Sequence, residues 1–521
     1  MARYYYIGIG GTGARVAEAL IHLCAAGQGP REFFFFLVDP DQNNGNLART
    51  KKLLDEYRDV RKLLGGGIDG LFGTEILTPP DATKVVWSVL PKHDATLAAH
   101  IKYPILEQQN RPLAQLADVL FTSQELATEL NEGFRGHPSI GAAVMAHPAD
   151  EEDPWRSFWD DLSKVPAPGD ARVFLAGSIF GGTGAAGVPT FGSRNLIKYH
   201  EKARLGEQSR VTLGGCLVLP YFTFDSNVPA SQADKLFVTW KDFPLATRAA
   251  LDYYALRDTE LVFDDLYLLG DKLAQSVGEF GAGANNQNNR PHYVELAAAL
   301  ATLDFWENSK PMPAVRSFFT AARNDEIVTF ESLPVTRREE ALRAEQERFR
   351  FNMIGMTLFA YAVSTYGLEV TGPSDAGATW YKEWFKIDPK REDLERFDPK
   401  SSTQRKKVEA AAAFGKNYLR WLAGMSSDDR VQLLETGALL DEQLWSEKQP
   451  RPRQVNERGV GQVVRGTDGG DFNGFISVLN YPDTAPQRGA DAANRLLSGF
   501  VTASRRFAQD RLKVPGPQGM R

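Results

Sequence analysis

The sequence has little cysteine and no long hydrophobic run. Only Cys24 and Cys216 occur among its 521 residues, and each lies inside an apolar segment. This argues against a disulfide framework and fits a reducing compartment. The longest apolar runs, such as residues 33–38, are far too short to cross a bilayer, and no signal peptide is evident. We therefore expect a cytoplasmic protein without an integral membrane segment.

The chain also lacks a large excess of charge of one sign. The 60 Lys and Arg residues nearly balance the 66 Asp and Glu residues, which leaves a formal net charge of −6. A mildly acidic chain has no general attraction for nucleic acid, so none is expected as a partner. No G-x-x-x-x-G-K-[ST] motif occurs, which argues against a Walker-type phosphate site. No internal repeat is apparent, and the length and 43% apolar content allow two or three domains.

Two glycine-rich loops, about 170 residues apart, are the most informative feature of the chain. The first reads Gly8-Ile9-Gly10-Gly11-Thr12-Gly13, and the second reads Gly181-Gly182-Thr183-Gly184. Each follows a short apolar run typical of a buried strand and precedes a stretch with helical spacing. Such a turn presents backbone N–H groups at the positive end of a helix, where a phosphate can bind.

The first loop is ambiguous when taken alone. Strands at 3–9 and 33–38 flank a helix, which gives a β-α-β unit and predicts a parallel sheet. The loop satisfies the dinucleotide pattern, with Asp39 after the second strand as a ligand for a ribose hydroxyl. The same short pattern also fits a site for another nucleotide, or a turn with a purely structural role. A dinucleotide fold has no need of the second loop, however, so the second loop favours a nucleotide held from two sides.

The motifs together resemble those of the tubulin/FtsZ superfamily, and of its divergent bacterial tubulin-like members in particular. The matches follow chain order: residues 8–13 resemble the first phosphate loop, 38–42 the N-T-D-x-Q stretch, 136–141 the loop that approaches the γ-phosphate, 176–187 the G-G-G-T-G-[ST]-G signature, 220–225 the P-F-x-F-E turn near the ribose, and 270–273 the N-D-K-L stretch. Together they cover about residues 3–305.

The resemblance implies an α/β fold: a Rossmann-like parallel-sheet GTPase domain of tubulin/FtsZ type. The expected domains are residues 1–290, with a long helical insertion at about 45–132, then a central helix at 291–310. A divergent, mostly helical domain with an irregular tail would occupy 311–521. The insertion, far longer than in FtsZ, could cover the nucleotide face or change the contact between subunits.

The resemblance also implies a binding site for GTP or GDP with Mg²⁺. Backbone amides of the two loops would surround the phosphates, with the Thr183 hydroxyl as a further donor. Arg15 is either a phosphate contact or a solvated arginine. Near the base, Tyr293 would stack, with His292 or Asn289 at the edge; the alternative is a core aromatic and a flexible loop. No metal-ligating residue is assigned. The predicted nucleotide-binding residues are Gly10, Gly11, Thr12, Gly13, Arg15, Asp39, Gly136, Pro138, Ser139, Gly181, Gly182, Thr183, Gly184, Asp225, Asn289, His292 and Tyr293.

Three departures from the superfamily pattern bear on function. Phe180 replaces the first glycine of the signature, so the loop must bulge or the ring must point away. The catalytic loop that should follow the central helix falls at about residues 310–316, which contain no carboxylate, while Asp304 and Glu307 are expected on the helix itself. GTP binding is therefore better supported than hydrolysis. The charged, helical C-terminal third also differs from the β-rich second domain of FtsZ.

Three functions follow from these patterns. The first is a tubulin-like GTP-binding protein that self-associates into filaments, with hydrolysis that is weak or depends on assembly. The second is a nucleotide-locked scaffold or regulator with protein partners in a bacterial multi-protein system. The third is an NAD(P)-dependent oxidoreductase, for which no convincing Tyr-x-x-x-Lys motif or His–Asp pair is found.

Overall fold

The protein is described from a computed structural model of the whole chain. The structure describes residues 2–41, 44–88, 90, 96–130, 133–134, 136–146, 150–166, 168–192, 197, 210–225, 240–256, 263–271, 275–279, 289–308, 317–320, 327–367, 380, 384, 397–398, 400–426, 430–435, 460–461, 463–464, 467, 469–470, 472–481 and 491–516.

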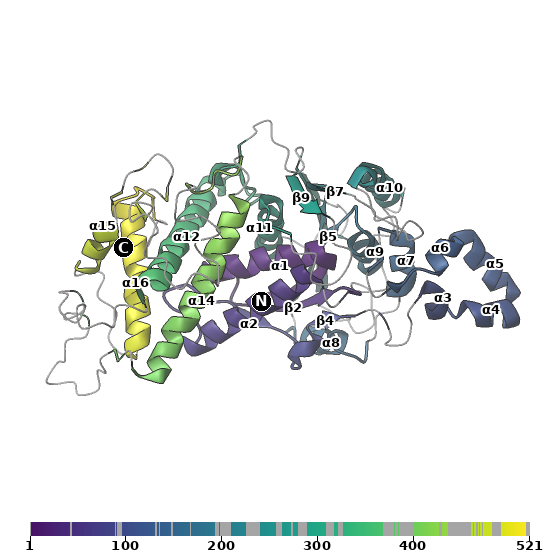
Figure 1. Ribbon diagram of the computed structural model, residues 1–521, viewed down its shortest axis with the longest axis horizontal. Helices are drawn as coiled ribbons and strands as arrows, with labels where there is room; N and C mark the ends of the chain where they lie inside the picture. Colours follow the sequence, from purple (N-terminus) through teal and green to yellow (C-terminus); the bar gives the residue numbers. More distant parts are fainter. Residues whose placement is uncertain are drawn as a thin grey trace.

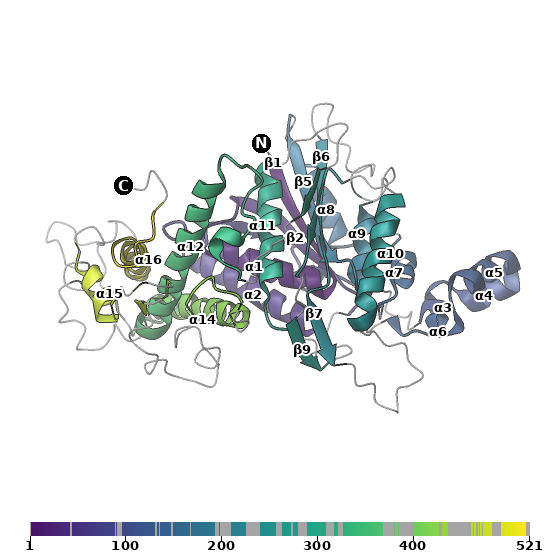
Figure 2. The same ribbon diagram turned by 90° about the horizontal axis from the view of Figure 1, so that it is seen from above.

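A parallel β-sheet forms the centre of the molecule, as predicted for an α/β fold (Figures 1 and 2). Its strands are β1 (Ala2–Ile9), β2 (Glu32–Val38), β3 (Glu75–Leu77), β4 (Val86–Trp87), β5 (Asp170–Ser178), β6 (Arg210–Val218), β8 (Asp265–Leu269) and β10 (Ser317–Thr320). They lie in the order β10-β8-β6-β5-β1-β2-β3, and β4 also pairs with β2. A separate parallel pair joins β7 (Phe222–Asp225) to β9 (Gln275–Glu279).

The sheet reverses its direction of growth between β1 and β5. From β1 the chain adds β2 and β3 on one side, then returns to place β5, β6 and β8 on the other. This is the doubly wound order of Rossmann folds, in which ligands bind beyond the carboxyl ends of the strands at the reversal point. Gly8 of β1 pairs with Leu37 of β2 and with Ala176 of β5, so both glycine-rich loops leave the sheet at this point.

The side chains of β1 point alternately to the two faces of the sheet. Tyr5 and Tyr6 are fully buried and point to opposite faces, as neighbours on a strand must. The Tyr5 hydroxyl donates to Asp161 at 3.1 Å, and the Tyr6 hydroxyl donates to the carbonyl of Gly13 at 2.8 Å. Each ring therefore fills the core while its polar end is satisfied, and Tyr6 braces the first turn of the helix that follows β1.

Helices cover both faces of the sheet (Figure 2). One face carries α1 (Gly10–Ala25) and α11 (Tyr293–Asn308), which pack against each other. The other carries α8 (Trp155–Leu162) and α9 (Gly182–Phe191), with α7 (Pro138–Met145) packed against α9. A further helix, α10 (Phe243–Leu256), lies near α9 in both views. Twelve of the 16 residues of α11 are buried, which confirms the predicted central helix.

The C-terminal part is mostly helical, also as predicted. Its elements are α12 (Leu342–Ala362), which continues into a π-helical turn (Val363–Gly367), α14 (Ser402–Met425), α15 (Phe472–Leu479) and α16 (Ala492–Asp510). Helices α12, α14 and α16 pack together, and α14 also packs against α2 (Gly45–Leu63) of the N-terminal part (Figure 1). Because β10 returns to the central sheet, the boundary expected at about residue 310 stays a prediction.

The segment at 45–132 combines three kinds of structure. Helix α2 lies beside α1, and the short strands β3 and β4 extend the sheet edge. Four short helices then form a separate arm: α3 (Leu97–His100), α4 (Tyr103–Gln109), α5 (Arg111–Leu120) and α6 (Ser123–Leu126). Single 3₁₀ turns occur at Ala82–Lys84, Trp240–Asp242 and Phe330–Ser332. Among the described helices, none is long and apolar enough to cross a membrane.

Candidate functional site

The two glycine-rich loops lie against each other at the carboxyl ends of β1 and β5. Gly10 adopts a left-handed backbone with φ of +71°. A Cβ atom at Gly10 would lie 3.3 Å from Cβ of Thr183 and 3.5 Å from the amide nitrogen of Gly184. Glycine is favoured at this position because other residues rarely adopt positive φ. Loops separated by about 170 residues of sequence therefore form one backbone surface.

Three helices begin at this surface. Helices α1 and α9 start directly from the loops, and a Cβ atom at Gly182 would lie 3.0 Å from the amide nitrogen of Gly136, just before α7. No side chain caps the first turn of α1, α7 or α9. The first N–H groups of a helix lack partners within it and carry partial positive charge. Three such ends at one place are suited to a polyanion.

Some glycines of the loops are required by packing, and others are not. A Cβ atom at Gly13 would lie 2.6 Å from the carbonyl oxygen of Ala176, and one at Gly184 would lie 2.5 Å from that of Ser178. These two glycines are needed for the loops to pack. At Gly11 the nearest atom would be the Asn44 side-chain nitrogen, at 3.4 Å, an ordinary contact. Gly11 is therefore free to face a ligand without a packing constraint.

Asparagines of α2 connect the first loop to the start of α11. The Asn44 side chain caps α2 by accepting from the N–H of Asn46 at 3.0 Å. Asn46 accepts in turn from the backbone N–H of Asn289 at 3.0 Å, and Arg49 donates to the Asn289 carbonyl at 2.9 Å. Glu18 of α1 holds Arg49 in place at 2.7 Å. The predicted base-side residue Asn289 thus lies next to the first loop, fixed through its backbone.

Arg15 lies in a buried ion pair. Only 2% of the residue is exposed, which excludes the alternative of a solvated arginine. Its guanidinium lies 3.0 Å from Glu295 of α11 and donates to the hydroxyl of Tyr221, which itself donates to Glu295 at 2.6 Å. Burial raises the pKa of Glu295, although the nearby Arg15 opposes that rise. The visible role of Arg15 is to join α1 to α11.

His292 and Tyr293 lie at the start of α11, where the base was predicted to bind. His292 is buried, with ring centroids 4.9 Å from Tyr221 and 4.7 Å from Tyr293. Its Nδ1 accepts from the N–H of Val294 at 3.2 Å, and its Nε2 lies 3.9 Å from Asp271. Tyr293 is only half-buried, so it is the more accessible ring of the two.

Asp39 follows β2, beside the first loop. It is 3% exposed, and its side chain accepts from the N–H of Asp41 at 3.0 Å. Burial raises the pKa of Asp39 to about 8, against the opposing effect of that hydrogen bond. A neutral, inward-turned carboxyl is a weak partner for a ribose hydroxyl, which an NAD site would require. Among the described residues, no group of three or more His, Cys, Asp or Glu side chains is arranged to hold a metal ion.

The loop before α7 connects the site to the arm. Pro138 and the exposed Ser139 form the first turn of α7, and His137 before them lies 3.1 Å from Glu125 of α6. Glu125 also completes a capping box with Thr122. Hydrogen bonds from Thr122 and the nearby His137 outweigh desolvation and lower the pKa of Glu125.

Phe180 points away from the loop surface. The residue is 4% exposed, and its ring centroid lies 4.5 Å from that of Phe243 and 5.6 Å from that of Phe222. Of the two arrangements expected for this departure, the structure therefore has the ring turned away into an aromatic cluster. The predicted ribose residue Asp225 ends β7, and its side chain lies outside the described residues.

The acidic residues near the end of α11 lie on the helix, as expected. Asp304 accepts from Arg337 at 2.7 Å and from the hydroxyl of Tyr267 at 2.7 Å. This carboxylate is therefore held in a buried cluster. The segment at 310–316, predicted to lack catalytic carboxylates, lies outside the described residues.

Sequence reasoning missed several residues that shape the site. Asn44, Asn46, Tyr221 and Glu295 all contact predicted residues, yet none was predicted as a site residue. The run Asn43-Asn44-Gly45-Asn46 at the start of a helix is a recognisable capping signal that could have identified Asn44 and Asn46. Nothing local marks the contacts of Tyr221 and Glu295, because their partner Arg15 lies more than 200 residues away in the sequence.

Comparisons with known proteins give few matches. No family model matches the sequence, and no curated protein does. One similar solved structure is CetZ2 from Haloferax volcanii, in a GTPγS-bound protofilament, at 15% sequence identity and a TM-score of 0.26. The match covers 58% of this chain, and the chain spans 58% of that protein's length.

Proposed function

We propose that this chain is a cytoplasmic, tubulin/FtsZ-like protein that binds GTP or GDP where the sheet reverses, between β1 and β5. The observation that carries the proposal is the contact of the two glycine-rich loops, with Gly10 against Thr183 and three uncapped helix ends at one surface. A helix N-terminus favours negative charge through its free N–H groups and its dipole. Three of them suit the terminal phosphates of a nucleoside di- or triphosphate, whereas a dinucleotide fold presents one such helix end to its pyrophosphate.

The predicted residues would divide the nucleotide among them. Amides of Gly10, Gly11 and Thr12, with Gly13 closing that turn, would surround one side of the phosphates. Gly181, Gly182, Thr183 and Gly184 would surround the other side, and the turn of Gly136, Pro138 and Ser139 would approach the last phosphate. Asp225 would lie toward the ribose, and Asn289, His292 and Tyr293 toward the base. The chain offers no metal cage among its described residues, so Mg²⁺ would be held mainly by phosphate oxygens.

The preference for guanine rests on the ordered resemblance to the tubulin/FtsZ superfamily, which also motivates self-association into filaments. Hydrolysis would be weak or dependent on assembly, because residues 310–316 supply no carboxylate. Phosphate release that rises steeply with protein concentration would support an assembling GTPase, and its absence a nucleotide-locked scaffold. Sedimentation that shows only monomers with GTP and Mg²⁺ at high concentration would contradict filament formation.

The binding site is tested best at Gly11. In Gly11→Ala, the added methyl meets no atom closer than 3.4 Å, and alanine is a good helix former, so stability should be kept or slightly raised. The methyl would lie beside Asn44 and Asn46, next to the loop amides proposed to hold the phosphates. We expect GTP affinity, measured by calorimetry after removal of copurified nucleotide, to fall about tenfold or more.

The matched control is Gly73→Ala. Gly73 is exposed, and a Cβ atom there would have nothing within 4 Å. This variant should bind GTP like the wild-type protein. Equal affinity of Gly11→Ala and Gly73→Ala would contradict the site, and tight binding of NAD in place of GTP would favour the oxidoreductase alternative.

A further inference from the structure

The α3–α6 arm (residues 96–130) stands out from the body of the molecule, at the right edge of Figures 1 and 2. Its base is closed by backbone pairing of Thr96 with Glu129. Within it, α4 and α5 form a hairpin in which the hydroxyl of Tyr103 donates to Asp118 at 2.6 Å. The arm therefore has internal structure of its own while most of its surface remains open.

In α5 the large apolar residues are exposed and the small ones are buried, which is the reverse of an ordinary surface helix. The residues it buries against the rest of the arm are Ala114 and Ala117, at 3% and 7% exposure. Its large apolar residues face outward: Leu113 is 44% exposed, Leu116 50%, Val119 83% and Leu120 57%. With Ile105 of α4, at 48%, they make up five of the nine large hydrophobic residues exposed in the described chain. Such a concentrated apolar patch marks an interaction site.

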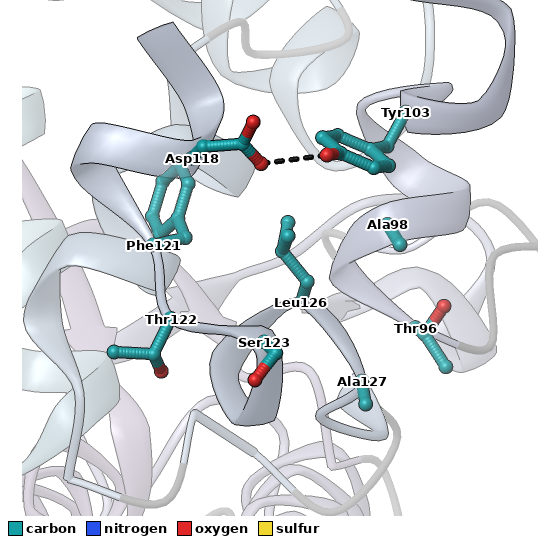
Figure 3. A pocket seen from close by; sticks show the side chains of 9 residues that line it. All are labelled: Thr96, Ala98, Tyr103, Asp118, Phe121, Thr122, Ser123, Leu126 and Ala127. Atoms are coloured by element: carbon teal, nitrogen blue, oxygen red, sulfur yellow. Dashed lines mark hydrogen bonds between the residues drawn. The ribbon is translucent and has the colours of Figure 1, made fainter. Parts of the chain in front are cut away.

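The arm also has an open pocket of about 620 Å³ between its two halves, lined by Tyr103, Asp118, Phe121 and Leu126 among others (Figure 3). The outward-facing leucines of α5 do not line this pocket. They therefore remain available for an external contact.

The spacing of the exposed leucines indicates that this contact is with another helix. Leu113, Leu116 and Leu120 stand at i, i+3 and i+7, the narrow seam of paired helices. The positions that flank the seam, Pro112 and Val119, are uncharged. An identical helix can therefore approach without repulsion between like charges.

Area favours a second copy of the same arm. The charged residues Arg111 and Asp118 lie on the face of α5 opposite the seam, so neither opposes the approach of an identical helix. From their exposed fractions, the five apolar side chains of two copies would together bury on the order of 1,000 Å², the lower bound for a specific interface.

We propose that the protein dimerises through its α4–α5 hairpins, which pair antiparallel about a two-fold axis near Leu116. A two-fold contact requires a surface complementary to itself, and a seam of leucines is one. The contact lies on the arm and not in the glycine-rich loops, so it stands whether or not the proposed nucleotide is correct.

The test is sedimentation velocity of the full chain over a concentration series into the tens of micromolar, after nucleotide removal so that nucleotide-driven assembly is absent. The wild-type protein should show a reversible dimer, and Leu116→Glu should be monomeric with an unchanged thermal midpoint. The matched control is Leu245→Glu, which introduces the same charge at a 71% exposed leucine of α10 and should leave the dimer intact.

A second variant gives a positive readout. Leu116→Cys should form a disulfide-linked dimer under mild oxidation, because the same residue of both copies lies near the axis, whereas the native Cys24 and Cys216 are buried. A wild-type protein that stays monomeric, or a dimer that survives Leu116→Glu, would overturn the proposal. Failure of Leu116→Cys to form the cross-linked dimer would also overturn the proposal. That result is expected if the hairpin binds a different protein.

Discussion

The two ends of helix α1 lie in opposite surroundings. At its N-terminus no side chain caps the first N–H groups, and Gly10 lies beside the second glycine-rich loop. Near its C-terminus His22 is 1% exposed, and its ring lies 4.6 Å from that of Trp421 at an interplanar angle of 27°, with Phe414 and Tyr418 at its edges. One helix thus has an end suited to a ligand and an end closed by packing. Changes at the first should alter binding, and changes at the second should alter stability.

The closed end predicts the largest effect on stability. Trp421→Ala removes a ring that is 3% exposed and leaves a cavity beside His22. We expect a loss of about 3–5 kcal/mol in the free energy of unfolding, read from the midpoint of urea denaturation. The conservative Trp421→Phe should lose much less. Unchanged GTP affinity of the folded Trp421→Ala variant would support the contrast between the two ends of α1. A loss of stability below about 1 kcal/mol would contradict tight packing at this end.

Arg15 tests how far along α1 the ligand-binding end extends. Arg15→Met leaves Glu295 buried without its cation, which should cost about 3 kcal/mol of stability. Adding Glu295→Gln should recover part of that loss, because the two side chains act as a pair. GTP affinity should fall less than in Gly11→Ala. If affinity is lost while stability is unchanged, Arg15 contacts a phosphate after all.

Asp39 predicts a pH dependence. Because its pKa is about 8 in the folded protein and near 3.8 when unfolded, the folded state binds the extra proton between these values. Stability should therefore fall as pH rises from about 4 to 8. Asp39→Asn cannot lose a proton, so its thermal midpoint should fall less between about pH 5.5 and 8.5 than that of the wild-type protein.

The control for Asp39 is the exposed Asp252 of α10, whose side chain is 71% exposed. Asp252→Asn should follow the wild-type pH profile. Identical profiles for Asp39→Asn and Asp252→Asn would contradict a buried, neutral Asp39 at the open end.

Thr183 predicts the smallest effect. Thr183→Val keeps the shape of the side chain and removes only a hydroxyl from the second loop. We expect GTP affinity to fall about three- to tenfold, near 1 kcal/mol, by calorimetry. Thr190→Val, at the far end of α9, should bind like the wild-type protein. Equal affinities for the two valine variants would exclude the Thr183 hydroxyl as a donor.

The same contrast explains what could be predicted from the sequence. The parallel sheet, the central helix and both glycine-rich loops follow from local signals, namely apolar runs of strand length and glycines before helical spacing. Strands such as β3 and β4, of three and two residues, are too short to leave a periodic pattern.

Contacts between distant parts of the chain left no such signal. The Arg15–Glu295 pair and the aromatic contact of His22 with α14 join residues hundreds of positions apart. The outward-facing leucines of α5 were also not predicted, because helical spacing shows that one face is apolar and not which way that face points.

The central claim is that the open end of α1 binds a guanine nucleotide, and the most direct test is the nucleotide that the protein itself retains. The freshly purified protein would be denatured and the released small molecules separated by anion-exchange chromatography, with titrations of GTP, ATP and NAD if none is retained. The account predicts GDP or GTP, or selective binding of GTP in the titrations. Release of NAD, or no binding of any guanine nucleotide, would contradict it.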